Sequence, residues 1–297
     1  PMRWILTWKP LDEFQDPERE PQPGIIREDG FAKAKARIVL IGYKHPDLAK
    51  RDPRTGKPLL QTSSPTLSRL GRNLLLQPAA LDRHILECAD AKSAFLQTDE
   101  GIGTKDLFTR GVEEVRIALG LSKGEAMQVV GAVYGLTNAP RIFWRDADSK
   151  LQALGFTPHA IDKCVWLYKN SEGQVIGRIG AHVDDFLIMG DHTSTEWLNV
   201  RAKIFDMYQW SPWKRGSFTF AGVQLHQLQD YTIVMSQEQF CNQLQPVKIE
   251  NERSRAKDDA LTPKELSQTR GLVMQAQWRA IQTAPQYCCR IGLESSS

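Results

Sequence analysis

The sequence predicts an α+β fold in which hairpins and short strands alternate with helices. Two stretches are typical of hairpin-like units, one with strands at residues 4–9 and 36–42, and one at residues 173–190. Apolar residues recur at helical spacing in residues 66–80 and 140–154. The chain has 297 residues, of which 41% are hydrophobic and 25% charged, so it has a globular composition and enough length to bury a core.

The first hairpin-like unit has strands at Trp4-Ile-Leu-Thr-Trp-Lys9 and Ala36-Arg-Ile-Val-Leu-Ile-Gly42. Residues 12–30 between them are rich in Pro, Glu and Asp, which predicts an exposed connection. From Lys33 to Lys57 there are eight basic residues against two acids. That excess suits a polyanion such as nucleic acid or a triphosphate, with a solvated basic loop as the alternative.

Two further elements follow. Residues 66–80 predict a helix, because Leu67, Leu70, Leu74 and Leu75 lie at helical spacing. In residues 83–97 the first half predicts a buried strand and the second half the start of a helix, with Asp90 at the junction.

Two later helices carry terminal signals. Pro140 suits the first turn of a helix that should end near Leu154, and Gly155 suits the position just past its end. Thr262-Pro-Lys-Glu265 is a capping box, so a helix should begin there and stop before Pro285.

The five cysteines are odd in number and form no Cys-x-x-Cys pair. A disulfide framework or a zinc knuckle is therefore not expected, and a reducing intracellular setting fits better. No apolar run approaches the roughly 20 residues that span a bilayer, and no secretory signal is visible. Because the chain begins at Pro1 rather than Met, we expect it to be a segment of a longer product.

Adjacent carboxylates, Asp184 and Asp185, lie at the tight turn of the hairpin in residues 173–190. They repel each other unless water, hydrogen bonds or a cation offsets the charge, and Mg²⁺ prefers such oxygen ligands. The alternative is a solvent-exposed turn, where Asp is common. If the strand ending at Asp90 neighbours this hairpin, Asp90 could share metal ions with Asp184, although Asp90 also suits a helix N-cap.

Several segments together carry a family resemblance, and they occur in one order along the chain: Lys35-Ala-Arg-Ile-Val39, Thr62-Ser-Ser-Pro-Thr66, Asp90-Ala-Lys-Ser-Ala-Phe-Leu96, Tyr134-Gly-Leu-Thr-Asn-Ala-Pro-Arg141, His182-Val-Asp-Asp185 and Phe220-Ala-Gly222. Over nearly its whole length the chain resembles the reverse transcriptase of copia-type retrotransposons. Each segment alone is a weak signal, whereas the ordered set is a strong one.

The resemblance implies an RNA-directed DNA polymerase with a right-hand fold. Its palm would have a ferredoxin-like (RRM-like) antiparallel sheet packed on helices. We expect fingers at residues 1–80, a palm at 81–245 with an inserted fingers segment at 100–140, and the start of a thumb or connection at 246–297. The expected partners are a primed RNA or DNA template and deoxynucleoside triphosphates. Ribonuclease H and integrase portions of the parent polyprotein are expected but absent from this chain.

The resemblance also implies site residues. Asp90, Asp184 and Asp185 would be catalytic and would hold two Mg²⁺ or Mn²⁺ ions together with the backbone carbonyl of Ala91. The implied nucleotide-binding residues are Lys35, Arg37, Phe95, Tyr134 and Gly135. Phe95 would exclude a ribose 2′-hydroxyl, although a core aromatic side chain is the alternative, and a surface strand face is the alternative for Lys35 and Arg37.

His182, Arg141 and Gly222 are the expected primer or template contacts. His182 stands where the family usually has a Tyr that packs near the primer terminus, and Thr137-Asn138 stands where it has Lys-Gln, which removes one positive charge near the template. The alternatives to an active polymerase are an inactive relic, a domesticated nucleic-acid-binding module, and an unrelated metal-dependent phosphotransferase. A polymerase of this kind would work in a cytoplasmic particle or in the nucleus, away from membranes.

Overall fold

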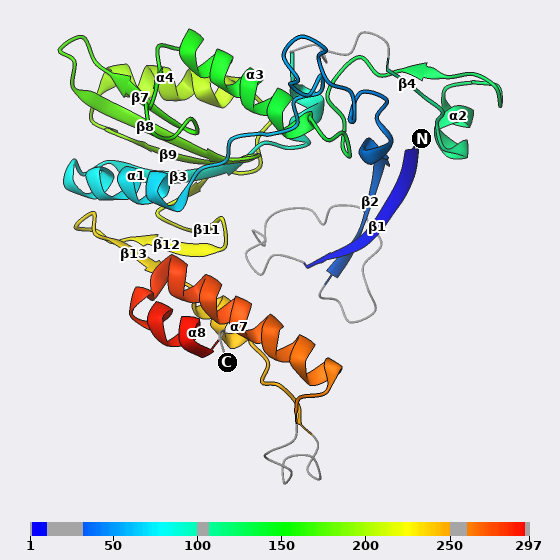
Figure 1. Ribbon diagram of the computed structural model, residues 1–297. Coiled ribbons are helices and arrows are strands. Elements are labelled where there is room, and N and C mark those ends of the chain that lie inside the picture. Colours follow the sequence, from blue (N-terminus) through cyan, green and yellow to red (C-terminus); the bar gives the residue numbers. More distant parts are fainter. Residues whose placement is uncertain (1, 11–31, 100–106, 250–259, 295–297) are drawn as a thin grey trace. The chain divides into compact units, whose positions relative to one another are not determined.

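The computed structural model describes four stretches of the chain, residues 2–10, 32–99, 107–249 and 260–294 (Figure 1). These form two compact units, the first from Pro1–Pro65 and Ser93–Lys150, the second from Thr66–Lys92 and Leu151–Ser297. Both units combine helices with antiparallel sheets, which confirms the predicted α+β class. The connection expected at residues 12–30 lies outside the described residues.

A long antiparallel hairpin opens the first unit. Its strands, β1 (Met2–Pro10) and β2 (Ala32–Leu40), pair without interruption from Met2 opposite Leu40 to Pro10 opposite Ala32. Both predicted strands are therefore confirmed, and β2 begins earlier than expected because Lys33 and Lys35 still have partners on β1.

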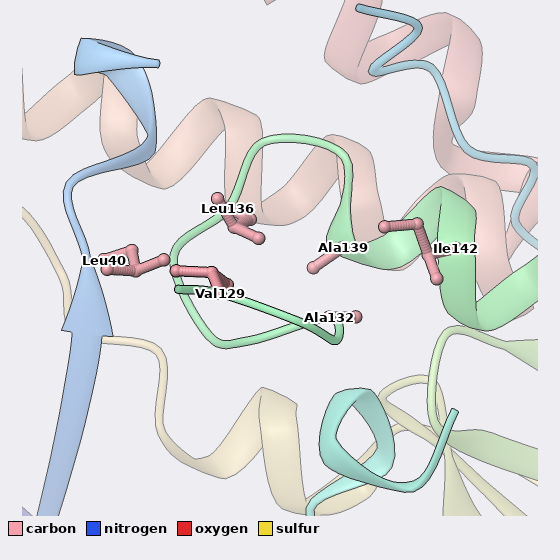
Figure 2. Close-up of a cluster of buried hydrophobic side chains, with 6 residues drawn as sticks. All are labelled: Leu40, Val129, Ala132, Leu136, Ala139 and Ile142. Carbon is pink, nitrogen blue, oxygen red and sulfur yellow. The ribbon is translucent and has the colours of Figure 1, made fainter. Parts of the chain in front are cut away.

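The remaining elements of the first unit are short apart from its last helix: η1 (Gly42–Lys44), η2 (Ala94–Gln97), β4 (Phe108–Thr109), α2 (Glu113–Ala118), β5 (Met127–Gln128) and α3 (Ala139–Ala153), which continues into the second unit. A small apolar core joins the end of β2 to the start of α3 (Figure 2): Leu40, Val129, Ala132, Leu136, Ala139 and Ile142. The Leu40 amide also donates to the Tyr134 carbonyl at 2.8 Å, so this core fixes β2 against the loop before α3.

A six-stranded antiparallel sheet forms the second unit. Its strands lie in the order β10 (Lys214–Arg215), β3 (Ile85–Asp90), β9 (Asp185–Gly190), β8 (Val175–His182), β7 (Val165–Lys169) and β6 (Thr157–Pro158). The predicted hairpin of residues 173–190 is confirmed as β8 and β9. The two central strands are almost wholly buried, which suits their apolar sequences.

Helices cover both faces of this sheet (Figure 1). A Cβ atom at Gly180 would lie 2.5 Å from Leu75 of α1 (Arg69–Leu81), and one at Gly177 would lie 2.0 Å from Trp197 of α4 (Thr195–Asp206). Side chains alternate between faces along a strand, so positions 177 and 180 of β8 face opposite sides. The sheet is therefore enclosed by α1 on one face and α4 on the other.

A second sheet and the last helices complete this unit: β11 (Ser217–Phe220), β12 (Val223–Gln227), β13 (Ile233–Ser236), α5 (Glu238–Asn242), α7 (Pro263–Thr283), η3 (Pro285–Tyr287) and α8 (Cys288–Glu294). The Gln227 side chain connects the two sheets, because its amide donates to the His84 carbonyl and its oxygen accepts from the Leu86 amide. None of the described helices has the length and apolar character needed to cross a bilayer.

The predicted helices are confirmed with one correction. α1 and α3 occupy the expected ranges, and α7 begins at the capping box of Thr262 and Glu265. After β3, however, the chain forms only the short 3-10 helix η2. Its N-cap is Ser93 in a left-handed conformation with φ of 51°, so the N-cap alternative for Asp90 is wrong.

Candidate active site

The turn between β8 and β9 carries two of the three aspartates. His182 pairs with Asp185, so the turn consists of Val183 and Asp184 alone. Val183 has φ of 61°, a costly conformation for a β-branched residue, of the kind that persists where the surrounding structure enforces it. The Ala91 amide donates to the Asp184 carbonyl at 2.9 Å. This bond ties the turn to the end of β3.

The third aspartate lies directly opposite this turn. Asp90, the last residue of β3, is the antiparallel partner of Asp185. Directly opposed residues have their Cβ atoms about 5 Å apart, and like charges at that separation destabilise the pair. Burial, and then the charges of Asp90 and Asp184, raise the pKa of Asp185 to about 6. Lys214 on the edge strand β10 acts in the opposite direction.

The donor atoms at this sheet end suit a hard divalent cation. The described residues contain no group of three or more His, Cys, Asp or Glu side chains in place to hold a metal ion. Asp90 and Asp185 are nevertheless directly opposed across adjacent strands, Asp184 is next to Asp185 along the chain, and all three side chains are oxygen donors. Burial is the largest cause of the raised pKa of Asp185, and the charges of Asp90 and Asp184 add to it; a bound cation would oppose both effects.

Three of the predicted nucleotide-binding residues contact one another within the first unit. The Arg37 guanidinium lies over the Tyr134 ring, 5.7 Å from its centroid. The Phe95 ring meets the Tyr134 ring edge-on at a centroid distance of 5.1 Å. The sequence segments around β2, η2 and the loop before α3 therefore converge on one aromatic and basic cluster.

Lys35 and Gly135 belong to the same part of the first unit. Lys35 lies two residues before Arg37 on β2, so both side chains point to the same face. Gly135 has φ of 89°, and a Cβ atom there would lie 2.0 Å from the Leu40 carbonyl oxygen. Only glycine fits this close approach of the loop to β2.

Phe95 is held on two sides. It packs against the apolar core of the first unit and lies 6.3 Å from the Phe143 ring. The segment that follows it is fixed to α3, because the Asp99 amide donates to Asp146 and the Lys150 ammonium bridges the carboxylates of Asp99 and Asp146 at 2.9 and 3.0 Å. Phe95 is thus partly a core side chain, as the alternative interpretation expected.

The three expected primer or template residues lie in different places. His182 is paired with Asp185 at the edge of the aspartate cluster. Arg141 donates to the Ser63 carbonyl at 2.8 Å and so holds the end of the first segment of the first unit. Gly222 lies in the β11–β12 turn, where a Cβ atom would lie 2.7 Å from the Trp278 ring. Of these three, His182 is the residue that the structure pairs with an aspartate of the cluster.

Two residues near the aspartates belong to none of the sequence motifs and were not predicted. Lys214 pairs with Cys88 on the edge of β3, and the Ser211 hydroxyl lies 3.1 Å from an Asp90 carboxylate oxygen. Both belong to the segment between α4 and β11, in which apolar residues recur at neither helical nor strand spacing. The one usable signal is Pro212, which restricts Ser211 to an extended backbone.

A family of known proteins matches most of the chain, including the segments that carry the three aspartates. The family described as reverse transcriptase (RNA-dependent DNA polymerase) matches residues 27–255. The Retrovirus-related Pol polyprotein from transposon TNT 1-94 of Nicotiana tabacum is 27% identical over 169 residues, which is 56% of this chain and 12% of that polyprotein. No solved structure matches the chain.

Proposed function

Because the chain belongs to the reverse transcriptase (RNA-dependent DNA polymerase) family, we propose that it extends a primer along an RNA template at the Asp90, Asp184 and Asp185 cluster. The observation that carries the proposal is the pairing of Asp90 with Asp185 across adjacent strands, beside the turn that holds Asp184. All three aspartates lie in segments that carry the family resemblance.

We propose that the palm expected at residues 81–245 lies mainly in the second unit and that the fingers expected at residues 1–80 and 100–140 lie mainly in the first, with α1 as the part of the expected fingers that belongs to the second unit. The six-stranded antiparallel sheet between α1 and α4 supports the palm assignment. The hairpin of β1 and β2, with Lys35 and Arg37 on one face, supports the fingers assignment. The thumb or connection would begin near residue 246, after the second sheet and α5.

Asp90, Asp184 and Asp185, with the Ala91 carbonyl, would hold two Mg²⁺ or Mn²⁺ ions. When bound, such ions polarise the primer 3′-hydroxyl and neutralise the leaving pyrophosphate. The protein's own part is to hold the three acidic residues close together. The backbone bond between Ala91 and Asp184 and the Asp90–Asp185 pairing support that role.

The aromatic and basic cluster of the first unit would bind the incoming nucleotide. Lys35 and Arg37 suit the triphosphate, since guanidinium binds phosphate oxygens through two parallel hydrogen bonds. Phe95, held against the core and α3, is rigid enough to exclude a 2′-hydroxyl sterically. Tyr134 and Gly135 would line the pocket beside it.

Primer extension on an RNA template, with Mg²⁺ or Mn²⁺, tests the proposal. Asp184→Asn removes one carboxylate charge without changing side-chain size. We expect extension to fall by more than about 100-fold, which is the upper end of the loss seen when only an outer-shell partner is removed. Asp206→Asn is the matched control, since Asp206 is an exposed residue at the end of α4 and should leave the rate unchanged.

Equal extension by the wild type and Asp184→Asn would show that the polymerase assignment is wrong. A chain that binds primer–template with a steep salt dependence but never extends it would be the inactive, nucleic-acid-binding alternative. A shallow salt dependence would favour an enzyme acting on small phosphorylated substrates.

A further inference from the structure

The loop after α4 runs along the free side of the end of β3. The Lys92 amide donates to the Gln209 carbonyl, and the Ser211 amide donates to the Asp90 carbonyl, each at 2.8 Å. Between these two bonds, Ala91 and Trp210 form an isolated antiparallel bridge. It lies on the same edge of β3 as strand β10. The backbone of Ser211 is therefore held directly against Asp90.

Two neighbours of Ser211 keep the loop in this position. Pro212 follows it and disfavours a helical backbone at Ser211, which suits strand-like pairing. Trp210 precedes it and is 8% exposed. Its indole N–H donates to two carbonyls in the last turn of α4, at 3.2 and 3.0 Å, and its ring meets Phe186 edge-on at 5.2 Å. Phe186 is the residue after Asp185, so the loop also packs against the strand that carries Asp185.

The Ser211 side chain makes the contact that matters for chemistry. Its hydroxyl lies 3.1 Å from Oδ2 of Asp90. An ionised carboxylate only accepts hydrogen bonds, so the hydroxyl is the donor. Asp90 is thereby bonded to Ser211 through both its carbonyl and its carboxylate. Rotation of the carboxylate breaks the second bond while leaving the first intact.

We propose that Ser211 is a positioning residue, whose hydroxyl fixes the Asp90 carboxylate in the orientation that binds a divalent cation. The inference rests on the proposed function. It adds a residue that lies outside the six motif segments named for the family resemblance. Hydrogen bonds from outer-shell groups orient metal-binding side chains, and their loss costs about 10–100-fold in metal affinity or activity. Ser211 itself does not touch the reacting atoms.

Two substitutions separate the hydroxyl from the backbone. Ser211→Ala keeps the amide that bonds Asp90 and removes only the hydroxyl. Ser211→Thr keeps both, and threonine suits an extended backbone. Titration of the full chain with Mn²⁺, without nucleic acid, should show about 10-fold weaker binding for Ser211→Ala and near wild-type binding for Ser211→Thr. The melting temperature of the metal-free protein should be the same in all three.

Primer extension gives a second, independent measurement. Ser211→Ala should be slower than wild type at subsaturating Mn²⁺ and should recover at saturating Mn²⁺, because only the orientation of Asp90 is changed. Ser217→Ala, at an exposed serine on β11, is the matched control and should behave as wild type in both measurements.

Three results would overturn the inference. Unchanged Mn²⁺ affinity in Ser211→Ala would show that the hydroxyl does not position Asp90. Equal losses of affinity and melting temperature in the Ala and Thr variants would show a purely structural role. A wild-type chain that binds no Mn²⁺ would overturn both the positioning role and the proposed function. If the wild type binds Mn²⁺ more tightly than Ser211→Ala but extends no primer, only the proposed function fails.

Discussion

At the residue scale, the energetics of the candidate site centre on Asp185. The carboxyl is half-buried and faces Asp90, and its pKa rises from the ordinary value of 3.8 to about 6, first because of burial and then because of Asp90 and Asp184. A raised pKa means that the protonated form is favoured by folding. Its contribution to stability is therefore fully present below about pH 4 and is lost as the pH rises through about 6.

Asp185→Asn should consequently stabilise the metal-free protein at pH 7, where the wild-type carboxylate is ionised. The advantage should shrink between pH 6 and pH 4, as the wild-type side chain becomes protonated. Each kcal/mol of relieved repulsion would raise the melting temperature by about 2–4 °C. Thermal unfolding in EDTA across this range measures the effect.

His84 complicates absolute pH profiles in the same range. Burial, and then Arg178, lower its pKa to about 4, so its contribution is present above about pH 6.5 and is lost as the pH falls. Wild type and Asp185→Asn share His84, so their difference isolates the aspartate. A variant that melts below wild type at pH 7 would contradict the repulsion, and Asp206→Asn should show no pH-dependent difference.

At the scale of elements, α4 buries Trp197, Val200 and Ile204, and Trp197 makes the closest approach to the sheet. Trp197 is wholly buried over Gly177 and Gly190, which are cross-strand partners on β8 and β9. A Cβ atom on either glycine would lie 2.0 Å or less from the indole ring. The two glycines thus create the hollow that the large side chain fills, at the opposite end of β9 from Asp185.

Gly190→Ala should destabilise the protein, because the indole must shift within a close-packed interior. Overpacking of this kind costs about 1–3 kcal/mol. Gly271→Ala is the matched control with the opposite sign. Gly271 lies in α7, where a Cβ atom would meet open space, and alanine favours helices over glycine by about 0.5–1 kcal/mol. Chemical unfolding compares the two variants. An unchanged or higher free energy of unfolding for Gly190→Ala would contradict the close packing of Trp197 against Gly190.

The elements that could be predicted are those specified by residues close together in the sequence. Helices α1, α3 and α7 have apolar spacing or terminal residues that specify them without tertiary contacts. The helix start expected after Asp90 is only the short 3-10 helix η2, which follows Ser93 in a left-handed conformation that nothing in its neighbours along the sequence requires. The bridge formed by residues 209–211 depends on pairing with β3, more than a hundred residues earlier, which no local pattern encodes.

At the scale of the whole molecule, the candidate site is a product of strand order. Asp90 and Asp185 are 95 positions apart along the chain. They meet because β3 lies beside β9 in the sheet. The family resemblance identified the aspartates and implied that they converge, whereas the register that opposes Asp90 to Asp185 and the Ser211 contact come from the structure. The nucleotide-binding candidates gather separately in the first unit, around Tyr134.

The most direct measurement is single-turnover primer extension by Asp90→Asn, Asp184→Asn and the double variant, on an RNA template with Mn²⁺. If the two carboxylates act as one unit, each single substitution should remove nearly as much activity as both together. Losses that multiply in the double variant, or a wild-type rate for Asp90→Asn, would contradict a shared site at the ends of β3 and the β8–β9 hairpin.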